Sequence, residues 1–142
     1  MQEQGRVSEV HVVEAWHAAL NEGDVDRLVG LSHPDVEIGG PRGVGRGVQL
    51  LREWVDRANV RLDPQRVFRR GSKVVVEQAG QWHSAESGEA IGSQTVASVF
   101  AVSDGLVTSL VRHDDLSEAL RTMGLDQSDE IRPEHRTRGH GG

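Results

Sequence analysis

Cysteine is absent from the 142-residue sequence, so a disulfide framework, a thiolate metal site and a cysteine nucleophile are all excluded. Long apolar runs are absent too, because no stretch approaches the roughly 18 uninterrupted apolar residues that identify a membrane-spanning helix. Residues 1–7 hold neither the basic region nor the apolar region of a secretion signal. These absences predict a cytoplasmic protein without a membrane partner.

Basic residues are in the minority. The chain has 16 Lys+Arg against 22 Asp+Glu, a net charge of 16 − 22 = −6, and its basic side chains cluster only near the C-terminus. Binding to nucleic acid needs a basic surface that neutralises phosphates, so a nucleic-acid partner is not expected. Apolar residues make up 36% of the chain, which is enough for the core of one domain.

Several motifs of known chemistry are also missing. The glycines of Gly43–Gly47 lack both G-x-G-x-x-G and Walker spacing, and G-x-S-x-G does not occur. The sequence has no H-E-x-x-H, and His11 and His17 are six residues apart, which places them on different faces of a helix. We therefore expect neither a metal site nor a cofactor.

The N-terminal half has the apolar spacing of helices. Apolar residues recur at helical spacing over 8–22, and 51–58 repeats this spacing. Asp24 is a favourable N-cap for a short helix between them. Before the helix at 51–58, the sequence predicts a short strand, 36–38, and an irregular glycine-rich loop, 39–47.

The second half changes to strand-like spacing, with β-branched residues enriched and turn signals between the runs. Asp104-Gly105 lies between two apolar runs and predicts a type I′ hairpin, because that turn needs positive φ at both central residues. A last helix is predicted from Leu116 to Met123. The predicted strands cover 60–69, 73–86, 90–102 and 106–114.

The expected organisation is a single α+β domain, 8–124, in which helices cover one face of a curved sheet. Residues 1–7 form a short N-terminal extension. The segment 125–142 is polar and lacks periodicity, so we expect it to be disordered.

Five short motifs stand out along this domain. They are Trp16-x-x-Ala19-Leu20-Asn21-x-Gly23-Asp24, His33-Pro34-Asp35-Val36-Glu37, Gly45-Arg46-Gly47, Asp104-Gly105-Leu106-Val107 and Asp115-Leu116-x-Glu118-Ala119-Leu120. With these motifs in this order, the sequence resembles the SnoaL-like proteins of the nuclear transport factor two-like superfamily. The resemblance implies a cone-shaped, curved antiparallel sheet covered by three N-terminal helices, with a short C-terminal helix. It does not fix a function, because this fold hosts isomerases, cyclases, epoxide hydrolases, dehydratases and binding modules.

The catalytic residues of ketosteroid isomerase are missing from this sequence. The resemblance places the isomerase tyrosine at Trp16 and its two aspartates at Ile38 and near Ala97. None of these side chains can abstract a proton beside a carbonyl or hold the enolate oxygen. Isomerisation of that type is therefore not expected.

The epoxide hydrolase residues are missing as well. The resemblance places that Arg-Asp-Asp set at Gln78, Gly80 and Arg112. Polyketide cyclases of the superfamily use an acidic residue in the cavity, and only Asp114 and Glu37 are near enough to be candidates.

Alternation along the strands predicts which side chains face the interior of the cone. The inward sets are Thr95, Ala97, Val99 and Ala101 on one strand and Thr108, Leu110, Arg112 and Asp114 on the next. Together with the tryptophans, they predict a mainly apolar cavity for a flat or cyclic hydrophobic molecule. The predicted ligand-binding residues are Trp16, Leu20, Ile38, Trp54, Gln78, Trp82, Ala97, Val99, Leu110 and Arg112.

Core packing is the competing interpretation of the tryptophans, because tryptophan at helical spacing is more often part of a core. Arg112 in a cavity needs a partner, which is Asp114, Glu37 or an anionic ligand. If the register slips by one residue, Arg112 points outward and His113 becomes the candidate acid or base.

Three functions remain open at this point. The first is a non-enzymatic homodimer that binds a small hydrophobic molecule in its pocket. The second is a cyclase, isomerase or dehydratase with Asp114 or His113 as acid/base and Arg112 stabilising negative charge. The third is a dimeric interaction module, and it depends on an apolar patch that alternation places on the outer sheet face: Val96, Phe100 and Val102.

Overall fold

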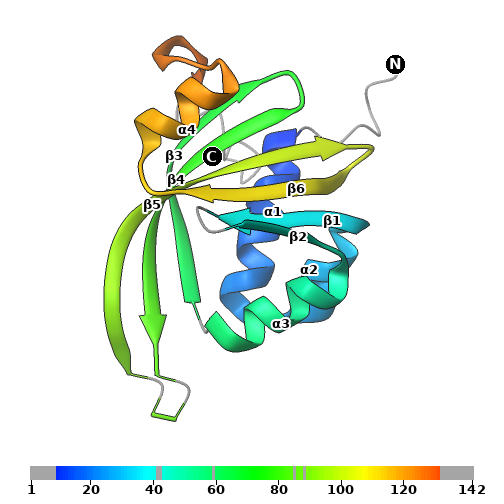
Figure 1. Ribbon diagram of the computed structural model, residues 1–142, viewed down its shortest axis with the longest axis vertical. Coiled ribbons are helices and arrows are strands. Elements are labelled where there is room, and N and C mark those ends of the chain that lie inside the picture. Colours follow the sequence, from blue (N-terminus) through cyan, green and yellow to red (C-terminus); the bar gives the residue numbers. More distant parts are fainter. Residues whose placement is uncertain (1–8, 41–42, 59, 85, 88, 132–142) are drawn as a thin grey trace, which may run out of the picture.

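The computed structural model describes residues 9–40, 43–58, 60–84, 86–87 and 89–131. Within these residues lies one seven-stranded, curved sheet with the order β2-β1-β6-β5-β4-β3-β7 (Figure 1). Its strands are β1 (Ser32–Gly40), β2 (Gly43–Arg46), β3 (Val60–Arg70), β4 (Lys73–His83), β5 (Ala90–Ser103), β6 (Leu106–His113) and β7 (Glu130–Ile131). Neighbouring strands are antiparallel, except that β1 runs parallel to β6.

Helices cover both faces of this sheet. The concave face carries α1 (Glu9–Glu22), α2 (Val25–Gly30) and α3 (Val48–Ala58), and the other face carries α4 (Leu116–Met123). Asp24 caps α2 by accepting a hydrogen bond from the Arg27 N–H at 3.2 Å, and Asp115 caps α4 in the same way at 2.7 Å. The predicted α+β class is confirmed. Within the described segments, none of the helices has the length and apolar character that crossing a bilayer requires.

The hairpin between β5 and β6 has the predicted turn. Asp104 and Gly105 both have positive φ, 55° and 78°, as a type I′ turn requires. The strands β3 to β6 are sequential antiparallel neighbours and form a meander.

A β-bulge on β6 lies just beyond this turn. Val102 pairs with Val107, but Ala101 pairs with Ser109, so Thr108 is an extra residue on β6. The extra residue shifts the register, and Ser98 lies opposite Arg112 where unbroken pairing would put Ala97. A shift of one residue exchanges the two faces of a strand relative to its neighbour.

The side chains of β5 consequently face the opposite way from the prediction. Ala97 and Val99 pack beneath α4, so the prediction that they face the cavity is wrong. The predicted outer patch is also wrong, because its three residues are buried in the core on the concave face: Val96, Phe100 and Val102. The interaction module thereby loses the surface on which it depended, and homodimer formation stays a prediction.

The glycine-rich segment predicted as an irregular loop is a hairpin of β1 and β2. Gly39 pairs with Val44, and Ile38 pairs with Gly45. The two strands approach closely because glycine leaves space: a Cβ on Gly39 would lie 2.6 Å from Cγ2 of Val44 and 2.7 Å from the carbonyl oxygen of Gly43. The loop prediction failed because it considered only the conformational freedom of glycine. Hydrogen bonds between β1 and β2 hold these glycines in an extended conformation.

The prediction of disorder after Gly124 is wrong for the first seven residues of the segment. Leu125 is buried, the 3-10 turn η1 (Gln127–Asp129) follows, and β7 pairs with β3. Arg66 holds this turn by donating to both carboxylate oxygens of Glu130, at 3.0 and 2.9 Å. The remainder, 132–142, and the extension 1–7 lie outside the described residues.

Gly39→Ala tests the close approach of β1 and β2. The added Cβ forces the hairpin apart, and we expect a loss of about 1 to 3 kcal/mol in the free energy of unfolding, as for other overpacked sites. Urea unfolding at pH 7 measures this loss. Gly92→Ala is the matched control, because a Cβ on this strand glycine would meet nothing within 4 Å. Equal stability of the two variants would contradict the close approach.

Candidate functional site

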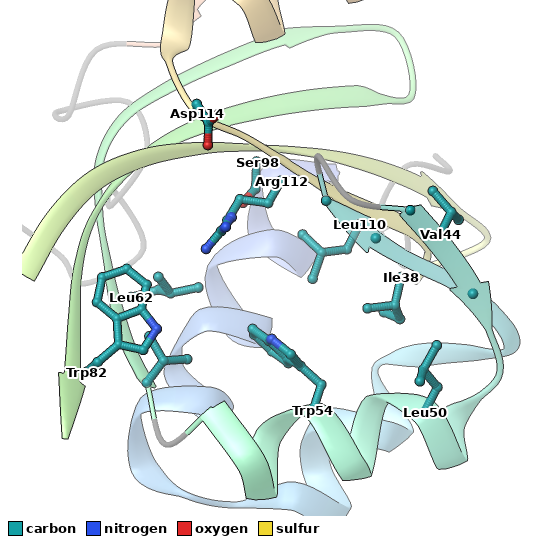
Figure 2. Close-up of a pocket in the computed structure, with 15 residues that line it drawn as sticks. Ile38, Val44, Leu50, Trp54, Leu62, Trp82, Ser98, Leu110, Arg112 and Asp114 are labelled. Atoms are coloured by element: carbon teal, nitrogen blue, oxygen red, sulfur yellow. The ribbon is translucent and has the colours of Figure 1, made fainter. Parts of the chain in front are cut away.

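An open pocket of about 770 Å³ lies between α3, the β1–β2 hairpin and the concave face of the sheet (Figure 2). Most of its lining is apolar, and two half-buried indole rings, Trp54 from α3 and Trp82 from β4, lie on its wall. Three polar side chains complete the lining: Ser98, Arg112 and Asp114. Glycines of the β1–β2 hairpin form part of the rim.

About half of the predicted ligand-binding residues line this pocket. Those that do are Ile38, Trp54, Trp82, Leu110 and Arg112, and the candidate acid Asp114 joins them. Those that do not are Trp16, Leu20, Gln78, Ala97 and Val99. The lining residues come from α3 and the strands β1 to β6, with Asp114 just after β6, so their spacing along the chain does not group them.

Trp16 belongs to the core. Its side chain is fully buried, it stacks on Trp54 at a centroid distance of 6.5 Å, and it meets Phe100 edge-on at 5.3 Å. Its indole N–H donates to Oγ of Ser32 at 3.2 Å. Core packing is therefore the correct interpretation for Trp16, whereas Trp54 connects the core to the pocket.

Arg112 extends its guanidinium into the pocket (Figure 2). Within the described part of the chain, this side chain forms no ion pair and no hydrogen bond. Neither of the predicted partners holds it: Asp114 lies on the same wall without an ion pair to it, and Glu37 accepts a hydrogen bond from Ser109 at 3.1 Å. The cavity thus presents a cation and a carboxylate to whatever enters it.

His113 lies on the other face of the sheet. Its Nδ1 is 3.5 Å from a carboxylate oxygen of Glu118 on α4, and it does not line the pocket. The alternative register, in which His113 replaces Arg112 in the cavity, is therefore wrong. Because of the bulge on β6, the side chains of β5 face the opposite way from the prediction. Those of residues 110–114 face the predicted way.

A chain of buried hydrogen bonds joins α1 to the wall of the pocket. Nδ1 of His17 is 2.8 Å from the carbonyl oxygen of Val13, and Nε2 of His17 is 2.8 Å from Nε2 of Gln78. Oε1 of Gln78 accepts from the Ser98 hydroxyl at 2.8 Å. All three side chains are buried, yet Ser98 also lines the pocket.

Sequence reasoning missed most of this series of hydrogen bonds. Gln78 was expected to contact the ligand directly, and His17 was considered only as a metal ligand. One signal was present, because Gln78 is a polar residue in a run of core-forming valines and His17 has Val13 and Leu20 as helical neighbours. The identity of the partners, however, depends on how α1 crosses the sheet.

Burial controls the charge of His17. Desolvation lowers the pKa of His17 from 6.5 to about 4, although the hydrogen bond to Val13 and the charge of Asp63 act in the opposite direction. The imidazole is therefore neutral at physiological pH. In the described ranges, no three His, Asp or Glu side chains gather as a set that could hold a metal ion.

An open, curved sheet with three helices around a pocket on its concave side defines the cone of the nuclear transport factor two-like class. The chain belongs to one family of this class: a family model described as a SnoaL-like domain matches residues 13–110. No curated protein matches the sequence.

Solved structures agree with this assignment. A nuclear transport factor two-like protein of unknown function from Cytophaga hutchinsonii is 16% identical, with a TM-score of 0.66 over 85% of this chain and 98% of the other. TerC, co-crystallised with polyporic acid, is 21% identical, with a TM-score of 0.65 over 80% and 95%. A candidate polyketide cyclase from Xanthomonas campestris is 22% identical, with a TM-score of 0.62 over 80% and 94%. At these identities the likeness shows the fold alone.

The buried state of His17 predicts how stability depends on pH. Below pH 6.5 the unfolded chain takes up a proton at this residue, whereas the folded chain does so only near pH 4, so stability falls as the pH falls through this window. We expect His17 to account for a loss of about 3 kcal/mol between pH 7 and pH 4. Urea unfolding at several pH values measures it.

The variant His17→Gln should lack this part of the pH dependence, whatever its stability at pH 7. His11→Gln is the control, since it removes an exposed histidine of the same helix and should keep the wild-type change of unfolding free energy with pH. If the unfolding free energy of His17→Gln changes with pH as it does in the wild type, His17 is not buried in its neutral form.

Proposed function

We propose that this SnoaL-like protein binds a small, flat, mainly apolar molecule that carries an anionic group. The observation behind the proposal is the guanidinium of Arg112, which has no ion pair or hydrogen bond with the described residues and lies within an open apolar pocket of about 770 Å³. Pockets of this size and composition are the usual sites for small molecules.

The two indoles determine the shape of the ligand. Trp54 is held in place by stacking on the buried Trp16, so its ring is a fixed wall. Gly80 lies beneath Trp82, and a Cβ there would be 3.1 Å from Cη2 of the indole. Planar ligands gain both apolar burial and ring contacts on such walls.

Arg112 determines the charge of the ligand. The Arg112 side chain is exposed to solvent within the open pocket, and an anionic group that enters the pocket supplies charge-assisted hydrogen bonds to its guanidinium. TerC, which has a similar fold, was co-crystallised with an organic acid, polyporic acid. This co-crystal supports the choice of an acidic ligand.

Titration with 2-naphthoic acid and its neutral analogue 2-naphthamide tests the proposal. We expect the acid to bind more tightly than the amide in isothermal titration calorimetry. Arg112→Gln should weaken binding of the acid about tenfold and leave binding of the amide nearly unchanged, because one charge-assisted contact is lost. Arg121→Gln, which changes an exposed arginine on α4, is the matched control.

Indole N–H signals in ¹H–¹⁵N spectra locate the bound acid. The signals of Trp54 and Trp82 should shift most, and the signal of Trp16 should shift least because its N–H is bonded to Ser32 in the core. No binding of either compound, or equal binding of both by the wild type, would contradict the proposed function.

A second candidate function is catalysis of proton transfer. Asp114 lies on the pocket wall beside Arg112 (Figure 2), so one ligand can meet a carboxylate and a guanidinium together. In such a step Asp114 takes the proton from a carbon beside a carbonyl, the C–H electron pair forms a C=C bond, the π electron pair of the carbonyl moves onto its oxygen, and Arg112 stabilises the resulting enolate. His113 takes no part, because it lies on the other face.

Exchange of the C1 protons of 2-tetralone in D₂O, followed by NMR, measures this step. If Asp114 is the base, Asp114→Asn should slow the protein-catalysed exchange by about 100-fold or more, and His113→Ala should leave it unchanged. Asp56→Asn, on the exposed face of α3, is the matched control. Exchange that is no faster than in buffer, or that is unaffected in Asp114→Asn, would exclude this catalytic role.

A further inference from the structure

The hydrogen bonds between α1 and the pocket have a fixed direction. The carbonyl oxygen of Val13 can only accept, so Nδ1 of His17 carries the hydrogen of this contact. Because burial lowers the pKa of His17 to about 4, the ring is neutral and has no second N–H. Nε2 of His17 is therefore an acceptor.

The direction continues through Gln78 to the pocket. Nε2 of His17 accepts from the amide nitrogen of Gln78, which leaves the amide oxygen of Gln78 to accept from the Ser98 hydroxyl. Ser98 has a single hydroxyl hydrogen, and the hydrogen bond to Oε1 of Gln78 uses it. Toward the pocket, Oγ of Ser98 thus offers lone pairs only.

Ser98 lies directly opposite Arg112 in the β5–β6 pairing, and both line the pocket. Side chains at opposite positions of an antiparallel pair are neighbours on the same face. The wall therefore combines a donor with positive charge and a neutral acceptor at adjacent positions. A ligand that satisfies both needs an anionic group beside a hydroxyl or N–H group.

We infer that Ser98 is a specificity-determining residue that accepts a hydrogen bond from a hydroxyl or N–H group of the ligand. The inference rests on the proposed function and narrows the ligand class to flat apolar acids with a donor close to the acidic group. An ether or carbonyl oxygen at that position would face the lone pairs of Ser98 and be disfavoured.

The donor-to-acceptor direction of these hydrogen bonds can be tested without any ligand. Long-range ¹H–¹⁵N spectra at pH 7 distinguish a protonated from an unprotonated ring nitrogen. We expect the His17 tautomer with hydrogen on Nδ1. Hydrogen on Nε2 would reverse the chain, free the Ser98 hydroxyl to donate, and overturn the inference.

The donor preference is tested by calorimetry with three probes: 2-naphthoic acid, 4-hydroxy-2-naphthoic acid and 4-methoxy-2-naphthoic acid. We expect the hydroxy acid to bind about fivefold more tightly than the parent acid, the effect of one neutral hydrogen bond, and the methoxy acid to bind more weakly than the parent. In Ser98→Ala the advantage of the hydroxyl should disappear, and in Ser98→Thr it should return. Ser109→Ala makes the same substitution on β6 outside the pocket lining and should keep the wild-type ratio.

The outcomes separate the two proposals. If binding of 2-naphthoic acid depends on Arg112, the proposed function stands. The role of Ser98 is then overturned if the hydroxyl group gives no gain in affinity, or if it gives the same gain in Ser98→Ala. If none of the three acids binds, the proposed function fails and the inference falls with it.

Discussion

Trp16 holds together the elements that surround the pocket. Its fully buried ring contacts Phe100 of β5 and stacks on Trp54 of α3, and its N–H is bonded to Ser32 of β1. A large aromatic side chain of this kind contributes more buried apolar area than other residues of the core. These contacts fix α1 across the sheet and position α3 at the edge of the cone, so one end of the cone is filled and the other is left as a pocket.

Polar groups in the two ends of the cone have different environments. In the filled end, His17 and Gln78 are buried, and each has hydrogen-bond partners within the protein. Such a satisfied network avoids the cost of unpaired buried groups and fixes a single arrangement. In the open end, Arg112 and Asp114 form no such bonds among the described residues. Ser98 joins the two ends, because it donates to the network and also lines the pocket.

Much of the fold was predictable because it depends on local signals. The periodicity of the helices, the capping aspartates and the Asp104-Gly105 turn each act within a few residues. The pairing register was less predictable. A single extra residue at Thr108 replaced Ala97 by Ser98 as the neighbour of Arg112, and bulges have no strong sequence signal. The structure of residues 125–131 was missed for a similar reason, since the contact that holds this segment comes from Arg66, which is distant in sequence.

The sequence by itself determined the α+β class, the SnoaL-like resemblance, the positions of Ile38, Leu110 and Arg112 in the cavity, and the absence of cysteine chemistry. Tertiary structure alone decided which tryptophans are core and which line the pocket, because burial depends on the helix that packs against each ring. It also decided the pairing of Ser98 with Gln78 and His17. Hydrogen-bond partners 20 and 61 residues apart are chosen by how the sheet curves around α1, and no local pattern encodes that geometry.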